Sequence, residues 1–285
     1  MSNIPSIVSV DWLIKYFDDP YIVVLDASYH LPNSKRDADQ EFVKQHIPGA
    51  LRFSIDEIAD HSTKLPHMLP SPEIFDDAMQ DLGIGAGMRV ILYDSVGLFS
   101  AARAWWMFRH FGHDQVAVLD GGLPAWVAAG GDLQSGRSRV KPPPYPLKSS
   151  IASSDVVNAD DLTQNLNSKR ALVLDARSAD RFAGDAPEPR SGMRSGHIPG
   201  SINIPFAQLL NSDTGLMKTS DQLNEIFRAA GIKNEPLVVT CGSGVTACIL
   251  ALALETAGYQ VPKLYDGSWS EWGSRDDLPL ETGST

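Results

Sequence analysis

Residues 236–257 read PLVVTCGSGVTACILALALETA, an apolar run followed by a glycine-containing loop and then by a helical pattern. The apolar run indicates a buried strand, and the pattern Thr246–Ala257, which Gly258 closes, indicates a helix. A short buried strand that leads directly into a helix is typical of a parallel sheet with helices on both faces. Other short apolar runs alternate with helical patterns at Ser71–Leu82 and Ser100–Phe111. We therefore predict an α/β fold.

The chain contains an internal duplication. Four landmarks recur in the same order, at offsets that drift only between 146 and 151 residues. Such self-similarity over four separate stretches is not expected by chance and indicates two copies of one domain. The pairs are Ile22–Asp26 (IVVLD) with Ala171–Asp175 (ALVLD), His46–Ala50 (HIPGA) with His197–Ser201 (HIPGS), Arg89–Asp94 (RVILYD) with Pro236–Cys241 (PLVVTC), and Asp120–Gly122 (DGG) with Asp266–Ser268 (DGS).

A proline-rich segment separates the two copies. It reads SGRSRVKPPPYPLKSS at Ser135–Ser150. Its prolines prevent a helix and favour an extended chain. We predict a first domain at residues 1–135, a linker at 136–152 and a second domain at 153–285, each domain with a parallel sheet between two layers of helices.

Composition limits the classes of function. The chain has 285 residues, of which 43% are hydrophobic and 21% charged, and its formal net charge is -11. This charge repels nucleic acids and anionic lipids, so neither is an expected partner. Neither a targeting segment nor a membrane-spanning apolar run is evident, so we expect a cytoplasmic protein. The two cysteines, Cys241 and Cys248, are too few for a disulfide framework.

The duplication provides an internal control for function. Residues at matched positions in both copies are expected to support the fold, whereas residues present in one copy are candidates for chemistry. His46 and His197 occupy the same HIPG turn, and Trp126 matches Trp272. We therefore predict that all four residues have packing roles.

The sharpest difference between the copies falls at the end of the central strand, where the second copy has Cys241 and the first has Asp94. A strand, a loop with glycines and a helix N-terminus can turn successive N–H groups inward to bind an anion. These surroundings favour the thiolate form of Cys241, which we predict to be a nucleophile. The alternative is a small buried cysteine that only packs. Cys248 lies inside the apolar helical pattern and is expected in the core.

A nucleophilic cysteine in such a loop suits either phosphoryl transfer or sulfur transfer. Phosphatases of the cysteine type hold the phosphate with an arginine six positions after the cysteine, where this chain has Ala247. No charged side chain lies between Cys241 and Glu255. The clamp that a phosphate dianion needs is therefore missing from the loop, and sulfur transfer is favoured.

These features resemble the rhodanese superfamily, and more closely its 3-mercaptopyruvate sulfurtransferase branch. The resemblance covers nearly the whole chain and includes both HIPG turns, the DGG and DGSW motifs, and the loop CGSGVTA at 241–247. It implies two tandem rhodanese-like domains, of which the first lacks the catalytic cysteine and the second forms a persulfide on Cys241. Thiosulfate-using relatives carry basic residues after the cysteine, where this chain has Gly242 and Ser243. The substrate-binding loop residues that the resemblance implies are Gly242, Gly244, Val245 and Thr246.

Two arginines resemble the substrate-binding residues of this branch. They are Arg181 in DRF and Arg190 in EPR, and they flank a Gly/Pro-rich insertion that the first copy does not match. Planar guanidinium groups suit the carboxylate and the neighbouring carbonyl of a 2-oxo acid. The alternative is that both are solvated loop residues. Arg194, in the same insertion, is expected to be exposed.

The resemblance also implies a relay in which the loop serine is hydrogen-bonded to a histidine and an aspartate from the first domain. The corresponding residues are Ser243, His67 and Asp56, although Asp60 could take the place of Asp56. His67 has no counterpart in the second copy, which supports a functional role. With this relay the active site would lie between the domains, and Ser243 with His67 would assist proton transfer.

We therefore predict a two-step sulfurtransferase that needs no metal and no organic cofactor. Sulfur passes from 3-mercaptopyruvate to Cys241 as a persulfide, pyruvate leaves, and thioredoxin, a small thiol or cyanide accepts the sulfur. Two alternatives stay open: a thiosulfate sulfurtransferase, and a persulfide carrier that docks to a partner without turnover. The pair His110 and His113 is a weak metal candidate and is expected on the surface at a helix end.

Overall fold

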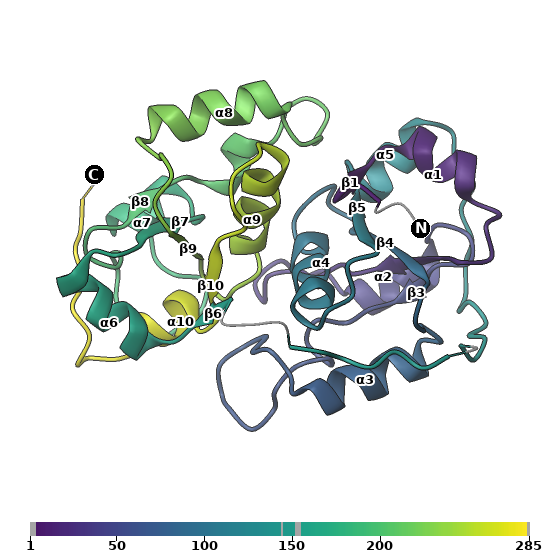
Figure 1. Cartoon of the computed structure of the whole chain (residues 1–285), viewed down its shortest axis with the longest axis horizontal. Coiled ribbons are helices and arrows are strands. Elements are labelled where there is room, and N and C mark those ends of the chain that lie inside the picture. The colour runs from purple at the N-terminus through teal and green to yellow at the C-terminus, as the bar shows by residue number, and fades with distance from the viewer. Residues whose placement is uncertain (1–3, 144, 152–154, 284–285) are drawn as a thin grey trace. The chain divides into compact units, whose positions relative to one another are not determined.

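The structure, a computed structural model, describes residues 4–143, 145–151 and 155–283. The chain forms two compact units, each built around its own sheet (Figure 1). Unit 1 contains Met1–His61, Leu69–Ser153 and Asp213–Leu216, and unit 2 contains Ser62–Met68, Ser154–Ser212 and Met217–Thr285. Each unit is therefore one copy of the duplication, except that the short segments 62–68 and 213–216 are grouped with the unit of the other copy.

The sheet of unit 1 has five parallel strands in the spatial order β1-β5-β4-β2-β3. The strands are β1 (Ile7–Val8), β2 (Ile22–Asp26), β3 (Leu51–Arg52), β4 (Arg89–Tyr93) and β5 (Val116–Leu119). The helices between and after them are α1 (Val10–Tyr16), α2 (Ala38–Lys44), α3 (Pro72–Asp81), α4 (Ala101–His110) and α5 (Gly122–Ala128).

Helices cover the sheet because alternate strand residues point to opposite faces and both sets are apolar. Tyr93 of β4 packs in one cluster with Leu13 of α1 and Trp126 of α5. In the other layer, α4 packs on β4 and β5, and the ring of Phe108 in α4 meets that of Phe75 in α3 edge-on at 5.3 Å.

The sheet of unit 2 repeats this order as β6-β10-β9-β7-β8, again with parallel strands. The strands are β6 (Val156–Val157), β7 (Leu172–Asp175), β8 (Ile202–Asn203), β9 (Leu237–Thr240) and β10 (Lys263–Tyr265). The helices are α6 (Ala159–Ser168), α7 (Ala179–Ala183), the 3-10 turn η1 (Phe206–Leu209), α8 (Ser220–Ala229), α9 (Ala247–Thr256) and α10 (Ser268–Trp272). The matching strand orders confirm the α/β class and the duplication.

The predicted helical patterns agree with α3, α4 and α9 to within one residue at each end. Every residue of α9 from Ala247 to Leu254 is buried, which explains why this helix shows no polar face. It lies against β9, whose four residues are also buried. The loop that joins them is therefore held at both ends by the core of unit 2.

The predicted linker, 136–152, includes Pro144 and Ala152, which lie outside the described residues. Its described part packs along unit 1. The N–H of Gly136 donates to the Val43 carbonyl at 2.8 Å, and that of Ser150 donates to the Phe111 carbonyl at 3.1 Å. The exact domain limits stay a prediction.

The residues shared by both copies have the same contacts in each. His46 is fully buried and stacks on Phe42 at 4.2 Å, and His197 stacks on Phe182 at 3.7 Å. The Nδ1 atom of each histidine lies within hydrogen-bonding distance of the carbonyl oxygen of the phenylalanine on which it stacks. Trp126 and Trp272 are also buried, with their indole N–H groups on backbone carbonyls. These contacts agree with the packing roles that the duplication predicts.

The expectation for His110 and His113 was wrong. Both side chains are buried, because His110 stacks on Trp106 at 5.2 Å and His113 packs against Phe108 at 5.5 Å. Burial lowers the pKa of His113. Among the described residues, no group of three or more His, Cys, Asp or Glu side chains is arranged to hold a metal ion.

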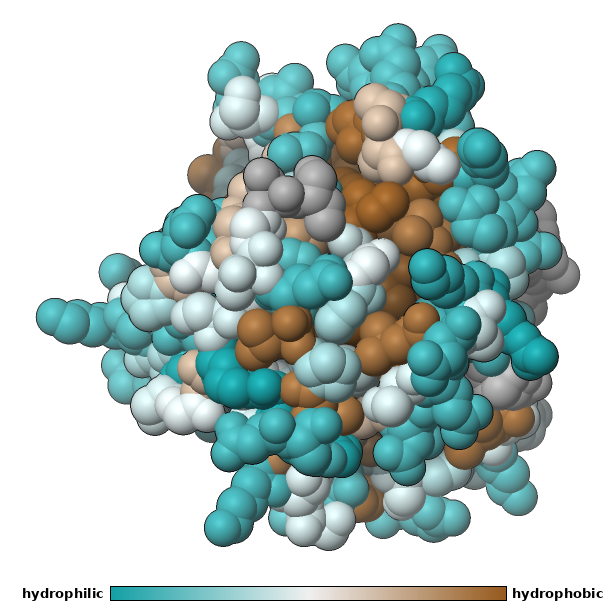
Figure 2. Space-filling model, turned by 90° about the vertical axis from the view of Figure 1, so that its left-hand side faces the viewer, coloured by the Kyte–Doolittle hydropathy of each residue, from teal (hydrophilic) through white to brown (hydrophobic). Residues whose placement is uncertain are grey.

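The face drawn in Figure 2 is mainly hydrophilic, with apolar residues in patches between the polar ones. Within the described part of the chain, no helix has the length and apolar character needed to span a membrane.

Candidate active site

Cys241 is the first residue after β9 and lies at the carboxyl end of the sheet in unit 2. Its side chain is buried. The loop runs from Cys241 to Thr246, which is the residue before the first turn of α9. Ligands bind at this end of the strands in open parallel sheets. Cys248 is fully buried, and its thiol donates to the Gly244 carbonyl at 3.3 Å, which confirms its expected place in the core.

Ser268, at the start of α10, supports the loop. Its Oγ accepts hydrogen bonds from the N–H groups of Cys241 at 3.2 Å and Gly244 at 3.0 Å. Its own hydroxyl donates to the Tyr265 carbonyl at 2.9 Å. Ser270 adds two bonds to the Gly242 carbonyl, from its N–H at 2.9 Å and its hydroxyl at 2.7 Å. The path of the loop is therefore set by α10.

Sequence reasoning did not identify Ser268 or Ser270 as site residues. A signal was present, since the matched motifs DGG and DGS differ at their third position, where the second copy replaces Gly122 with Ser268. The sequence comparison matched the two motifs without using that change. The N–H of Gly244, a predicted substrate-binding residue, donates its hydrogen bond to Ser268.

The matching loop of unit 1, after β4, shows which kind of group the N–H groups of such a loop bind. There the Asp94 carboxylate accepts five N–H bonds, two on Oδ1 and three on Oδ2. The donors are Val96 (3.0 Å), Gly97 (3.0 Å), Phe99 (2.7 Å), Ser100 (2.9 Å) and Ala101 (3.0 Å). A ring of backbone N–H groups around a carboxylate is an anion site, and the first copy fills it with its own side chain.

In unit 2 the matched ring is open. At the offset that pairs Asp94 with Cys241, the corresponding donors are Ser243, Gly244, Thr246, Ala247 and Cys248. Among the described residues, the N–H groups of Ser243, Thr246 and Ala247 have no hydrogen-bond acceptor. These three donors lie at the N-terminus of α9, where an anion is stabilised further.

A buried ion network lies beside the loop. Arg177 is bonded to Asp175 at the end of β7, with its Nη2 2.7 Å from Oδ2, and its Nη1 is 2.7 Å from Oε1 of Glu188. Its guanidinium lies 4.3 Å from the ring centre of Trp269. Burial alone would lower the pKa of Arg177, but the two carboxylates raise it above its usual range. Sequence reasoning missed Arg177 and Glu188.

Arg181, on α7, is brought to the loop. Its Nη2 bonds to Oε2 of Glu188, and it lies 3.0 Å from the place where a Cβ would be at Gly242. The Nε of Arg181 is buried and has no hydrogen-bond acceptor among the described residues. This donor is available to an acceptor from outside the chain, such as a ligand oxygen or an ordered water.

Arg190 and His67 meet within unit 2, although they are far apart in the chain. Nη2 of Arg190 donates to Nε2 of His67 at 3.1 Å. His67 is buried and has a positive φ of 58°, a conformation that is strained for a residue other than glycine. The guanidinium can only donate, so Nε2 of His67 is the acceptor and carries no proton in this contact.

The other two members of the predicted relay are Ser243 and Asp56. Ser243 is buried, and its hydroxyl has no hydrogen bond among the described residues. Asp56 belongs to unit 1, where its side chain is exposed. The structure therefore brings His67 to Arg190 and shows no hydrogen bond between His67 and Ser243.

Arg194 was expected to be exposed, and this was wrong. Its guanidinium donates to the backbone carbonyls of Trp272 at 3.1 Å and Gly273 at 3.3 Å. In return, the Trp269 indole donates to the Arg194 carbonyl at 2.9 Å. Arg194 therefore ties the insertion to α10.

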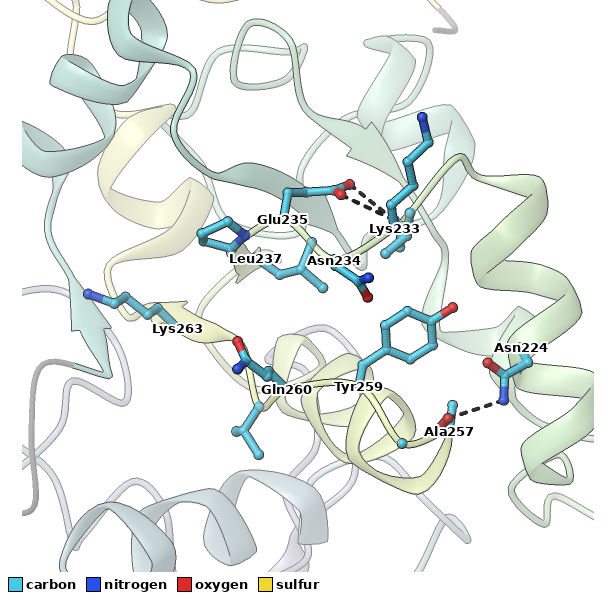
Figure 3. Close-up of a pocket in the computed structure, with 13 residues that line it drawn as sticks. Asn224, Lys233, Asn234, Glu235, Leu237, Ala257, Tyr259, Gln260 and Lys263 are labelled. Carbon is cyan, nitrogen blue, oxygen red and sulfur yellow. Dashed lines mark hydrogen bonds between the residues drawn. The ribbon is translucent and has the colours of Figure 1, made fainter.

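A pocket of about 570 Å³ lies at the opposite end of β9, near Leu237 (Figure 3). Lys233, Asn234, Tyr259 and Gln260 are among its lining residues, and the Glu235 carboxylate accepts from the Lys233 N–H at 3.2 Å. Its lining residues include no cysteine, and Cys241 lies at the other end of β9. This pocket is therefore separate from the cysteine loop.

The family model for the rhodanese-like domain matches residues 9–129 and 158–275, and the chain belongs to the rhodanese family. The relatives that it resembles over almost its whole length are sulfurtransferases. It is 44% identical over 276 residues to the 3-mercaptopyruvate sulfurtransferase of Escherichia coli K12, covering 96% of this chain and 97% of that one.

Two further comparisons agree. The chain is 42% identical over 306 residues to the mitochondrial thiosulfate/3-mercaptopyruvate sulfurtransferase 1 of Arabidopsis thaliana, covering 99% of this chain and 79% of that one. The crystal structure of the Escherichia coli 3-mercaptopyruvate enzyme superposes with a TM-score of 0.83 at 40% identity, covering 93% of this chain and 99% of that one.

Proposed function

We propose that this chain is a 3-mercaptopyruvate sulfurtransferase, in which Cys241 takes sulfur from 3-mercaptopyruvate and passes it to a thiol. The contrast between the two loops supports this most strongly. Unit 1 fills its ring of N–H groups with the Asp94 carboxylate, whereas unit 2 has a thiol at the matched position and open N–H donors. A thiolate or persulfide anion at Cys241 would take the place of that carboxylate.

The donor requires a clamp for a carboxylate beside a ketone. Arg181 offers its buried Nε–H, and Arg190 offers a second guanidinium in the same unit. We assign both arginines to the donor. Loss of one charge-assisted contact costs about 1.5–3 kcal/mol, which corresponds to roughly a 10- to 150-fold rise in the donor KM.

The first step forms a sulfur–sulfur bond and breaks the carbon–sulfur bond of the donor. The Cys241 thiolate attacks the donor sulfur, and the electron pair of the broken bond leaves on C3 as the enolate of pyruvate. The proton of the donor thiol moves to C3, so the products are pyruvate and a persulfide anion on Cys241. The open N–H groups of Ser243, Thr246 and Ala247 stabilise that anion.

Ser243 and His67 are our candidates for moving this proton. The Ser243 hydroxyl lies in the cysteine loop. His67 accepts from Arg190, so a donor carboxylate on Arg190 competes with His67 for that guanidinium. Asp56 stays a proposal for orienting His67.

The second step passes the outer sulfur to a nucleophilic acceptor, a thiolate or cyanide, which regenerates the Cys241 thiolate. Thioredoxin, a small thiol or cyanide is the proposed acceptor. Thiosulfate is a second candidate donor, since the Arabidopsis relative is named for both donors. The absence of basic residues after Cys241 favours 3-mercaptopyruvate.

The proposal is tested with Cys241→Ser, and with Cys248→Ser as the matched control. We expect the wild-type protein and Cys248→Ser to release pyruvate and to gain one sulfur on the Cys241 peptide in mass spectrometry, and Cys241→Ser to do neither. Sulfur found only on Cys248 would overturn the assignment. Steady-state kinetics with both donors separate the substrates: a larger kcat/KM for thiosulfate would assign the chain to that reaction, and a persulfide that no acceptor discharges would indicate a carrier.

A further inference from the structure

Glu188 connects the buried network to the cysteine loop. Its side chain is 2% exposed. One carboxylate oxygen bonds to Nη1 of Arg177 at 2.7 Å, and the other bonds to Nη2 of Arg181. The carboxylate therefore bridges two guanidinium groups, and that of Arg181 approaches the loop at Gly242.

Arg177 is a rigid support for this bridge. Its side chain has no exposed surface, and it is bonded through Nε and Nη2 to Asp175. Nη2 also donates to the Gly196 carbonyl at 2.8 Å, and the guanidinium lies on the Trp269 ring. With its partners fixed on every side, Arg177 holds one oxygen of Glu188 in place.

Arg181 depends on Glu188 for its position. The bond to Glu188 is the only side-chain hydrogen bond that Arg181 makes among the described residues. An arginine side chain has several freely rotating bonds, so without this bond its guanidinium would sample many positions. With it, Nη2 lies 3.0 Å from the Cβ position of Gly242, and the unpaired Nε stays buried beside the loop.

We propose that Glu188 is a positioning residue that holds Arg181 over the Cys241 loop and so sets the affinity for the anionic sulfur donor. The inference rests on the proposed function, because it assigns Arg181 to the donor. Glu188 could instead only neutralise Arg181, and the two roles have opposite consequences. Removing a positioning carboxylate weakens donor binding, whereas removing a neutralising carboxylate strengthens it.

The test compares Glu188→Gln with Asp185→Asn, which changes an exposed carboxylate of the same loop that makes no hydrogen bond or ion pair with the described residues. We expect Glu188→Gln to raise the KM for 3-mercaptopyruvate roughly 3- to 10-fold. The reason is that the flexible side chain of Arg181 would have to be ordered again each time the donor binds. The rate at which preformed persulfide is discharged to a thiol should be unchanged, and Asp185→Asn should have no effect. A KM that is unchanged or lowered in Glu188→Gln would overturn the proposal.

A double variant separates positioning from a general structural effect. In the Arg181→Ala background, Glu188→Gln should change the donor KM by less than about 2-fold, because its target is gone. The same rise in both backgrounds would show that Glu188 acts on the fold and not through Arg181. If Glu188→Gln does not fold, Glu188→Asp keeps the charge beside Arg177 but is too short to bridge both guanidinium groups. It should fold with a raised KM, and a wild-type KM would overturn the bridging role.

A second readout does not require sulfur transfer. The ratio of Cys241 alkylation rates with iodoacetate and with iodoacetamide reports the positive potential at the thiol, since only iodoacetate is an anion. Arg181→Ala should lower this ratio, and Glu188→Gln should lower it by less, because the lost negative charge partly offsets the displacement of the guanidinium. An increased or unchanged ratio in Glu188→Gln would refute positioning. A protein inactive toward 3-mercaptopyruvate but with the expected ratios would refute the proposed function alone.

Discussion

Single residues make the difference between two loops that share one backbone. Gly122 and Ser268 occupy matched positions with φ of 52° and 49°. A Cβ at Gly122 would lie 2.4 Å from the Asp94 carbonyl oxygen, so the closed loop of unit 1 requires glycine there. In unit 2 the same left-handed conformation carries a serine, at a cost of order 1 kcal/mol. The hydroxyl offsets this cost because it accepts two buried N–H bonds.

Gly242 provides a prediction at the residue scale. Its φ is not in the left-handed region, so alanine fits the backbone, but the added Cβ would lie 3.0 Å from Nη2 of Arg181. We expect Gly242→Ala to displace Arg181 by a few tenths of an ångström and to raise the donor KM roughly 3- to 10-fold. Stability should change by less than about 1 kcal/mol. Steady-state kinetics and thermal unfolding measure both effects, and a KM equal to that of the wild type would contradict the close approach.

At the scale of elements, the same strand–loop–helix unit serves two purposes. After β4 the loop is closed by the Asp94 carboxylate and stabilises unit 1. After β9 the loop is held from outside by α10, which leaves part of its N–H ring open. The first loop is closed by its own carboxylate, whereas the second leaves N–H groups open at the position where we propose the sulfur chemistry.

Asp94→Asn should therefore destabilise unit 1. Asparagine offers one acceptor oxygen and places an NH2 group where N–H donors converge, so several charge-assisted bonds are lost. We expect a loss of about 1.5–3 kcal/mol in chemical denaturation. Asp114→Asn is the control, because Asp114 is 65% exposed and pairs with Arg109 at 3.3 Å, and such surface pairs contribute little. Equal losses in the two variants would argue against the closed-loop interpretation.

The loop before α2 gives unit 1 a dependence on pH. Glu41 of α2 bonds to Arg36 at 2.7 Å and to His30 at 2.9 Å. These groups, and Arg36 most of all, lower the pKa of Glu41 from 4.5 to about 2. A carboxyl group whose pKa is depressed in the folded state stabilises the fold above its unfolded pKa, and this contribution is lost as the pH falls through the folded pKa.

We therefore expect unit 1 to lose stability from about pH 5 down to about pH 2, and Glu41→Gln to reduce this slope. Because the Glu41 side chain is 34% exposed, solvent screening limits the effect to about 1 kcal/mol. Denaturant midpoints measured across this range test the expectation. Parallel curves for the wild type and the variant would exclude Glu41 as the source.

At the scale of the whole molecule, the fold brings residues 62–68 of the first copy into unit 2. His67 thereby contacts Arg190, which lies 123 positions later. This grouping places a residue of the first copy in the unit that contains Cys241.

A double-mutant cycle tests this arrangement. Since His67 accepts from Arg190, we expect His67→Ala and Arg190→Ala each to raise the donor KM, and the double variant to be little worse than Arg190→Ala alone. The cycle of His67→Ala with Ser243→Ala tests the proposed proton transfer, for which we expect coupled losses in kcat. Independent, multiplicative losses in kcat would show that Ser243 and His67 do not act on the same proton.

The sequence by itself determined the α/β class, the duplication and the place of Cys241 at a strand-to-helix loop. These follow from apolar periodicity, glycine positions and spacing, all of which are local properties or simple offsets. Arg181 and Arg190 were predicted from their resemblance to a family and from an insertion that only one copy carries.

Only the tertiary structure decided which partners these residues have. The bridge through Glu188, the support from Ser268 and the contact between His67 and Arg190 each join residues that are separated in the sequence. The burial of His110 and His113 likewise depends on the packing around them. Periodicity assigns a residue to an element but contains no distance between elements. Hydrogen bonds and ion pairs form only when these distances are correct to within a few tenths of an ångström. The packing of the complete fold sets the distances.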